Sequence, residues 1–266
     1  MLLRRSFYLF FLIALAMGSA CRSRPGVSSG DVRGGPAPSQ PASDKPYKTV
    51  EIDSVDGTPI YGSMYAAAKP SSPAVLLLHQ WQSDRHSFDE FAARMQSRGF
   101  AVLAIDGRGF GESNHHANGS MLPAGRTDAD VRAMLGDVDA AFNYLSKQPS
   151  VDASKVGIVG ASYGSSLAMI YAADHSSVAA VALMSPGVNY FGNMQTEPAV
   201  KKYGTRPLFM TAAEDDKESA DAVRSLAADD ARAEQKIYST GGHGQALFEV
   251  GVADELERFL IANLQK

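Results

Sequence analysis

Cysteine is almost missing from this sequence: Cys21 is the only one in 266 residues. A single cysteine cannot form a disulfide within the chain, and it cannot build a thiolate metal site. The histidines and carboxylates do not supply other ligands, because no group of them has the spacing of a metal site. We therefore predict no metal and no other cofactor.

An excess of basic residues is also missing. Lys and Arg number 25 against 29 Asp and Glu, which gives a net charge of −4. No basic run alternates with aromatic residues, so a nucleic-acid partner is not expected. The composition is that of an ordinary globular protein, since 45% of the residues are apolar and 20% are charged.

The sequence has no apolar run long enough to cross a membrane as a helix. The run from Phe7 to Met17 falls short of the ~20 residues that a bilayer needs. It follows the basic pair Arg4-Arg5 and precedes Gly18-Ser19-Ala20, whose small side chains are typical of a cleavage site. This pattern predicts a signal peptide for export over residues 1–20.

Cys21 directly follows the predicted cleavage site. This placement resembles a bacterial lipobox, which implies that Cys21 is lipidated and becomes the new N-terminus. Gly18 departs from the pattern, because a leucine usually stands three residues before the cysteine. The alternative is ordinary cleavage after Ala20 without a lipid.

Residues 21–45 are rich in Pro, Gly, Ser and Ala and have few large apolar side chains. Such a segment buries too little surface to offset the entropy cost of ordering it, so we expect a flexible linker. The protein is then predicted to lie in the cell envelope, anchored by lipid and facing the periplasm or the outer surface. Without the lipid it would be periplasmic or secreted, since the anchor is the only membrane contact that we expect.

From residue 46 to residue 266, short apolar runs alternate with helical patterns. An Asp56-Gly57 turn between two β-rich runs predicts a hairpin. Buried strands are predicted over residues 74–78, 100–105, 156–159, 178–184, 208–211 and 237–238. Helical patterns follow most of these strands, and the last predicted helix carries residues 247–260.

This alternation decides the fold class. Parallel strands need crossover connections, so strands that alternate with helices predict an α/β domain with a mostly parallel sheet. Only a short stretch separates residue 184 from residue 208, which leaves no room for a sizeable cap domain.

The stretch Val156–Met169 carries the strongest chemical signal. A β-branched run leads into Gly160-Ala161-Ser162-Tyr163-Gly164, and a helical pattern of small residues follows. Gly-x-Ser-x-Gly between a strand and a helix is typical of a nucleophile elbow, a turn so sharp that the serine adopts a strained conformation. Side chains at the two glycines would collide with the neighbouring strand and helix. We predict that Ser162 is a nucleophile; the alternative is a glycine-rich turn with an incidental serine.

The domain resembles the α/β-hydrolase superfamily from about Tyr47 to Lys266. The similar segments, in chain order, are Leu77–Trp81, Asp106–Ser113, Gly160–Gly164, Glu214–Asp216 and Gly241–Gly244. The lack of a cap makes the chain most similar to the dienelactone-hydrolase and prolyl-oligopeptidase-like branches. The resemblance implies a mostly parallel central sheet with helices on both faces.

The resemblance also assigns roles to residues. Ser162 would be the nucleophile, His243 the general base and Asp216 the acid that orients the base, in the superfamily's order of serine, acid and histidine. The adjacent Asp215 is the alternative acid. Backbone N–H groups of Trp81 and Tyr163 would form the oxyanion hole.

Two positions depart from the family pattern. Gln80 replaces the usual glycine after His79, and Ala213 replaces a glycine that many members have before the acid. The backbone donors survive both changes, but we expect the Gln80 side chain to narrow or polarise the oxyanion region. His79 is expected to support its own loop.

The predicted function is that of an exported serine hydrolase that cleaves a carboxylic ester of a small molecule. A peptidase, a lactone hydrolase or a thioester hydrolase would use the same three residues. A catalytically inactive, envelope-binding lipoprotein is the alternative from another class. The oligomeric state stays open.

Overall fold

The computed structural model describes residues 45–230 and 232–266. The predicted signal peptide, Cys21 and all of the predicted linker except Lys45 lie outside the described residues. All of the described residues lie in one compact unit. No helix in the described part of the chain is long and apolar enough to cross a membrane.

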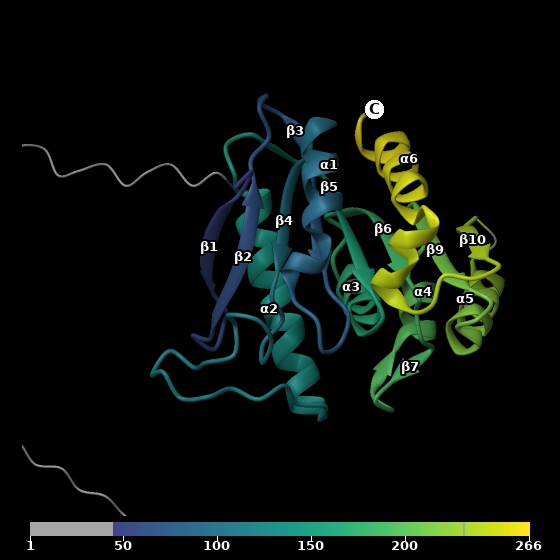
Figure 1. The fold of residues 1–266 in the computed structure, drawn as a ribbon, viewed down its shortest axis with the longest axis horizontal. Coiled ribbons are helices and arrows are strands. Elements are labelled where there is room, and N and C mark those ends of the chain that lie inside the picture. The colour runs from purple at the N-terminus through teal and green to yellow at the C-terminus, as the bar shows by residue number, and fades with distance from the viewer. Residues whose placement is uncertain (1–44, 231) are drawn as a thin grey trace, which may run out of the picture. The chain divides into compact units, whose positions relative to one another are not determined.

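The described residues contain an eight-stranded sheet with the order β1-β2-β4-β3-β5-β6-β9-β10 (Figure 1). Its strands are β1 (Lys48–Asp53), β2 (Pro59–Tyr65), β3 (Ser72–Leu78), β4 (Ala101–Ile105), β5 (Val151–Ala161), β6 (Val178–Met184), β9 (Leu208–Ala213) and β10 (Glu234–Tyr238). The β1–β2 and β2–β4 pairs are antiparallel, and every other pair is parallel. The predicted hairpin and the mostly parallel sheet are therefore confirmed.

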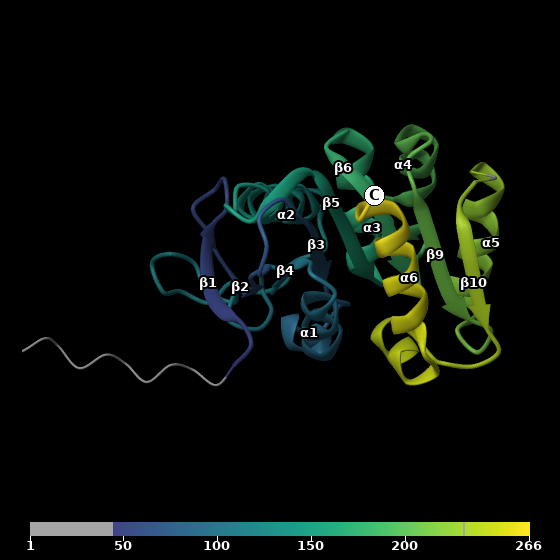
Figure 2. The same cartoon turned by 90° about the horizontal axis from the view of Figure 1, so that it is seen from above.

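Helices cover both faces of the sheet (Figure 2). They are η1 (Arg85–Phe88), α1 (Asp89–Ser97), α2 (Asp128–Ser146), α3 (Tyr163–Asp174), α4 (Thr196–Tyr203), α5 (Lys217–Asp229), η2 (Gly244–Val250) and α6 (Val252–Leu264). Buried side chains of α2, α3, α4 and α5 pack on one face, and those of α1 and α6 pack on the other. Alternate residues of β3 feed the two cores: Leu76 and Leu78 contribute to the first, Val75 and Leu77 to the second. This is why the central strands are apolar throughout.

Two segments differ from the sequence prediction. The last predicted helix is wrong as a single element, because Gly251 adopts a left-handed conformation (φ 89°) and separates η2 from α6. Between β6 and β9, the sequence analysis missed a small hairpin, β7 (Asn189–Tyr190) with β8 (Met194–Gln195), and the short helix α4. These elements are too small to form a cap domain, so the predicted fold class is confirmed.

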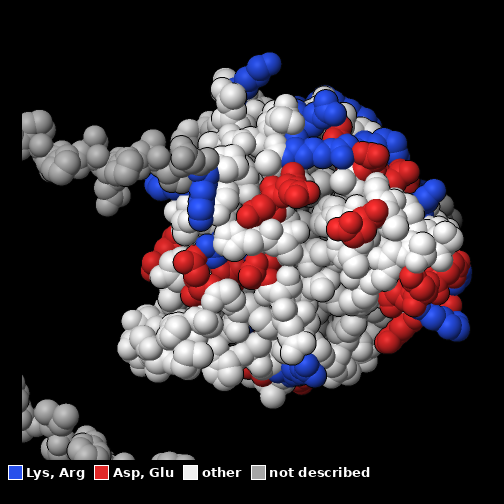
Figure 3. Space-filling view, in the orientation of Figure 1, with Lys and Arg blue, Asp and Glu red and all other residues white. Residues whose placement is uncertain are grey.

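The surface charge is mixed. On the face shown in Figure 3, Lys and Arg side chains are scattered among Asp and Glu side chains rather than gathered into one area.

Candidate active site

Ser162 lies at the turn between β5 and α3. Its backbone has φ 53° and ψ −124°, a strained conformation for a residue with a side chain. A Cβ on Gly160 would overlap the carbonyl of Gly164, and a Cβ on Gly164 would lie 2.6 Å from the carbonyl oxygens of Leu78 and His79. The turn therefore needs glycine at both positions, as the motif indicated.

The side chains of Ser162, His243 and Asp216 form one hydrogen-bonded series. His243 Nε2 lies 2.7 Å from Ser162 Oγ, and His243 Nδ1 lies 2.7 Å from Asp216 Oδ2. An ionised carboxylate can only accept, so Nδ1 carries the proton and Nε2 is left to accept from the serine hydroxyl. Asp216 comes from the start of α5 and His243 from the loop after β10. The structure thus brings together three residues that are far apart in the sequence.

Asp215 supports the loop that carries His243. Its carboxylate accepts hydrogen bonds from Thr240 Oγ1 (2.6 Å), the Gly241 N–H (3.2 Å) and the Gly242 N–H (3.0 Å). The bond from Thr240 is the main reason why the pKa of Asp215 is lowered. This carboxylate is therefore an acceptor that fixes the backbone just before His243.

Two further hydroxyl groups lie beside this series. The Tyr190 hydroxyl donates to the Ser185 carbonyl (3.0 Å), and Ser219 Oγ lies 3.5 Å from His243 Nδ1. Burial raises the pKa of Tyr190, and the nearby hydroxyls of Ser162 and Ser219 partly oppose that rise. The phenol therefore stays protonated at neutral pH. Sequence reasoning missed both residues, because no motif marks Tyr190 or Ser219.

The predicted oxyanion donors lie at the same edge of the sheet as Ser162. Trp81 follows β3 and Tyr163 follows β5, and these strands are parallel neighbours with Leu78 opposite Gly160. Tyr163 is the first residue of α3, so its N–H has no acceptor within the helix. No hydrogen bond from the Trp81 or Tyr163 N–H occurs within the described part of the chain.

His79 supports its loop, as expected. Its Nδ1–H donates to the Gln80 carbonyl (2.7 Å), and its Nε2 accepts from the Gly107 N–H (2.9 Å). Both ring nitrogens are therefore occupied in the neutral form. Burial lowers the pKa of His79, which is 1% exposed.

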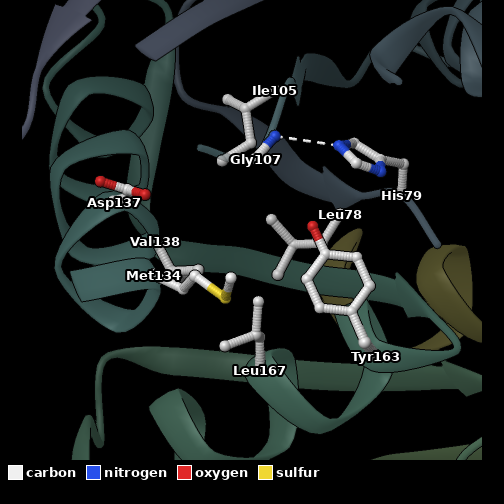
Figure 4. Close-up of a pocket in the computed structure, with 9 residues that line it drawn as sticks. All are labelled: Leu78, His79, Ile105, Gly107, Met134, Asp137, Val138, Tyr163 and Leu167. Atoms are coloured by element: carbon white, nitrogen blue, oxygen red, sulfur yellow. Dashed lines mark hydrogen bonds between the residues drawn. The ribbon is translucent and has the colours of Figure 1, made fainter. Parts of the chain in front are cut away.

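A small cavity lies next to His79 and the Tyr163 hydroxyl (Figure 4). Its volume is about 10 Å³, and α2 contributes Met134, Asp137 and Val138 to its lining. That volume holds about one water molecule. The cavity is thus too small for an organic substrate. In the described part of the chain, no group of three or more His, Cys, Asp or Glu side chains could hold a metal ion.

Comparison with known proteins places the chain in a family. Residues 60–250, more than half of the sequence, match the family model described as "Dienelactone hydrolase family". The chain belongs to the dienelactone hydrolase family. The predicted superfamily is thereby confirmed, and the chain is a hydrolase by family.

Two named proteins are distantly similar to this dienelactone hydrolase family protein. Thiohydrolase aneE of Aspergillus aculeatus is 29% identical over 120 residues, which are 45% of this chain and 35% of that protein. Polyketide transferase claH of Penicillium crustosum is 28% identical over 137 residues, which are 48% of this chain and 40% of that protein. The chain thus spans less than half the length of these relatives.

The fold is close to that of solved α/β-hydrolases. The crystal structure of α/β hydrolase GrgF from Penicillium sp. sh18 superposes with a TM-score of 0.69 and 15% identity. The match covers 83% of this chain and 100% of that one. At this identity the likeness shows the fold alone.

The side chains of Trp81, Phe110 and Phe191 pack together, and we call them the aromatic wall. The Trp81 ring meets the rings of Phe110 and Phe191 edge to face, with centroids 4.9 and 4.8 Å apart. The Arg126 guanidinium lies over both, 4.7 Å from the Trp81 ring and 4.9 Å from the Phe191 ring. An apolar surface with a cation above it therefore adjoins the predicted oxyanion donor.

The Asp106–Ser113 loop of this family member is held by buried polar contacts. Asp106 accepts from the backbone N–H groups of Arg85 and Glu112, both at 2.8 Å. Arg108 donates to Asp137 (2.6 Å) and Asp56 (2.8 Å). Burial raises the pKa of Asp137 against the effect of Arg108, whereas the bond from Arg108 lowers the pKa of the more exposed Asp56. These contacts fix the loop rather than face Ser162.

Proposed function

We propose that this protein is a serine hydrolase that cleaves a carboxylic ester through an acyl-enzyme. The observation that supports the proposal most directly is the contact series from Ser162 Oγ through both nitrogens of His243 to Asp216. A hydroxyl next to the free nitrogen of an oriented imidazole is the arrangement that activates a serine.

In the acylation step, Ser162 Oγ attacks the carbonyl carbon of the ester while His243 Nε2 takes its proton. The carbonyl oxygen becomes an oxyanion, which accepts from the N–H groups of Trp81 and Tyr163. Asp216 stabilises the imidazolium without taking a proton itself. The imidazolium then protonates the alcohol oxygen, the carbon–oxygen bond breaks, and the alcohol leaves.

In the deacylation step, His243 Nε2 takes a proton from water, and the hydroxide attacks the acyl carbon. The second oxyanion collapses, the bond to Ser162 Oγ breaks, and the proton on His243 returns to the serine. The products are the carboxylic acid and the free enzyme. The aromatic wall at Trp81 gives the substrate an apolar surface beside this chemistry.

The test is hydrolysis of p-nitrophenyl acetate and butyrate together with labelling by a fluorophosphonate probe. We expect wild-type protein to hydrolyse and label, and Ser162→Ala to lose labelling and at least about a thousandfold of its activity. Ser154→Ala, which changes an exposed serine, is the control and should match the wild type. A wild-type protein that neither hydrolyses nor labels would favour a binding lipoprotein instead.

A thioester donor is the second candidate substrate. The relatives named thiohydrolase and polyketide transferase support it, and they also raise transfer to an acceptor other than water. Comparing one acyl group as its oxygen ester and its thioester, with and without added alcohol, separates these possibilities. A higher kcat/KM for the thioester would favour the second candidate, and an ester product in alcohol would show transfer to an acceptor other than water.

We also propose that the protein is exported to the cell envelope and anchored through a lipid on Cys21. This proposal rests on the signal-peptide pattern and on the position of Cys21 after Gly18-Ser19-Ala20. The active domain would then act on substrates outside the cytosol.

A further inference from the structure

The loops that carry Trp81 and His243 start from distant strands of the sheet. The Trp81 loop follows β3 and the His243 loop follows β10, and β5, β6 and β9 lie between these two strands. Sheet pairing alone therefore does not fix one loop relative to the other. Yet a proposed oxyanion donor and a proposed base must both be placed correctly around Ser162.

Two glutamines join these loops directly. The Gln245 N–H donates to Gln80 Oε1 at 2.8 Å, and the Gln80 N–H donates to Gln245 Oε1 at 3.3 Å. The Gln245 side chain also donates from Nε2 to Ser87 Oγ at 2.6 Å, which ties it to η1. Each glutamine thus bonds the backbone of the other, and we call Gln80 with Gln245 the glutamine clamp.

The His243 loop is shaped around the Gln80 amide. Gly244 is buried and left-handed (φ 62°), and a Cβ at this position would overlap Gln80 Oε1. The Gly244 N–H donates to Ser185 Oγ at 2.8 Å. Gly244 is therefore held between Ser185, which follows β6, and the Gln80 side chain, directly after the proposed base.

We propose that the glutamine clamp positions the Trp81 N–H and His243 around Ser162, so that Gln80 and Gln245 are positioning residues of the reaction. This inference rests on the proposed function. Gln80 stands where the superfamily usually has glycine, and glycine has no side chain that could reach the His243 loop. The side chain that was expected to crowd the oxyanion region instead bonds the backbone on the other side of the site.

Loss of the glutamine clamp is expected to lower kcat and to leave KM nearly unchanged. Without it, the two loops keep their own anchors but lose their common alignment, and misplacement of a reacting group by about 1 Å can cost about a hundredfold in rate. Substrate binding to the aromatic wall would change little. A merely structural role would instead lower the fraction of folded enzyme and leave kcat per active site unchanged.

The experiment measures kcat per active site with p-nitrophenyl butyrate, counting sites with a fluorophosphonate probe. Gln80→Met keeps the length of the side chain but removes the acceptor, and Gln245→Ala removes both side-chain bonds. We expect each to lower kcat by about 10- to 100-fold, with KM within about threefold of the wild type. Gln96→Ala removes a glutamine side chain that donates to the Ala66 carbonyl away from the site; it is the matched control and should behave as wild type.

Two further variants sharpen the test. Gln80→Glu keeps an acceptor oxygen for the Gln245 N–H and should recover most of kcat. Its carboxylate would also stabilise the imidazolium of His243, so the acidic limb of the kcat/KM profile should move to higher pH. The double variant Gln80→Met with Gln245→Ala should be no slower than the slower single variant, because both break one unit.

The outcomes separate the two proposals. A wild-type protein that is inactive and unlabelled would overturn the proposed function and the clamp with it. An active, Ser162-dependent enzyme whose clamp variants keep kcat per site within about twofold of Gln96→Ala would overturn the clamp alone. Losses that simply multiply in the double variant would also overturn it.

Discussion

The adjacent carboxylates of Asp215 and Asp216 make different contacts because their side chains point to different parts of the His243 loop. Asp216 points to His243 Nδ1, whereas Asp215 accepts three hydrogen bonds from residues 240–242. The first contact can orient the proposed base and stabilise its cation. The second fixes the loop on which that base is carried.

Substituting each carboxylate by its amide should therefore have unequal effects. In Asp216→Asn, the amide favours the wrong tautomer of His243, and we expect kcat to fall by about 10³- to 10⁴-fold with little change in melting temperature. In Asp215→Asn, the loop loses an acceptor, and we expect a lower melting temperature with a loss of activity of less than about tenfold. Steady-state kinetics and thermal melts on both variants check this. Equal activity losses would contradict the assignment of Asp216.

His79 should make stability depend on pH in a defined direction. Burial lowers its pKa in the folded state from the ordinary value of 6.5. As the pH falls below about 6.5, the unfolded chain binds a proton here before the folded protein does. The contribution of His79 to stability is therefore complete above that pH and is lost as the pH falls toward the folded-state pKa.

His79→Gln tests this effect, because glutamine can accept from the Gly107 N–H but does not titrate. We expect the free energy of unfolding of the wild type, minus that of the variant, to shrink between pH 7.5 and pH 5.5, by no more than about 1.4 kcal/mol per pH unit. Chemical denaturation at the two pH values measures it. A difference that stays constant or grows on acidification would show that His79 does not titrate as described.

Substitution by alanine should change the free energy of unfolding in opposite directions at two glycines in helical segments. A Cβ on Gly164 would lie 2.6 Å from the backbone oxygens of Leu78, the last residue of β3, and His79, which cannot move without disturbing the sheet. Gly136 lies inside α2, and its Cβ would meet the Val55 side chain at 3.2 Å and Ser54 Oγ at an ordinary contact distance of 3.8 Å. Val55 is 88% exposed and can therefore move away.

We thus expect Gly136→Ala to raise the free energy of unfolding by about 0.5–1 kcal/mol, because alanine lowers the entropy cost of the helix. Gly164→Ala should lower it by about 3 kcal/mol or more through overpacking. Urea titrations of both variants decide the matter. A mild effect at Gly164 would mean that the elbow tolerates a shift of β3.

The sequence predicted those elements whose signal is local. The runs at residues 74–78 and 178–184 are apolar on both faces, and the elbow motif fixes a strand before Ser162 and a helix after it. The break at Gly251 was missed because the apolar spacing continues through it. The β7–β8 hairpin was missed because its strands are only two residues long.

The contacts around the site depend on tertiary structure and could not be predicted from local sequence patterns. Gln80 and Gln245 are 165 residues apart, and nothing in either neighbourhood indicates that their amides meet. The same holds for Tyr190, whose hydroxyl approaches Ser162 from a segment without a motif. The roles of Ser162, His243 and Asp216 stay predictions, although the geometry brings their side chains together.

The proposed lipid anchor and the proposed active site lie in different parts of the chain, so the location of the protein can be tested separately from its activity. The described domain contains the complete contact series of the proposed site, while Cys21 lies outside the described residues. Lipidation should therefore decide where the protein is found and not whether it is active. A single acyl chain binds membranes only marginally, so stable anchoring needs the several chains that a bacterial lipoprotein carries.

If Cys21 is lipidated, the full-length protein expressed in a bacterium should enter the membrane fraction and incorporate labelled palmitate. Cys21→Ser should lose the label and be mislocalised or left unprocessed, while its esterase activity per fluorophosphonate-labelled site stays within about twofold of the wild type. Ser39→Ala, which keeps the cysteine and the cleavage-site residues and changes only a residue of the predicted linker, serves as the control for effects on export. Wild-type protein that is soluble, begins at Cys21 and carries no palmitate would show that Ala20 precedes an ordinary cleavage site. In that case Gly18, where a leucine is usual, would be the physical reason why the lipidation machinery does not recognise the segment.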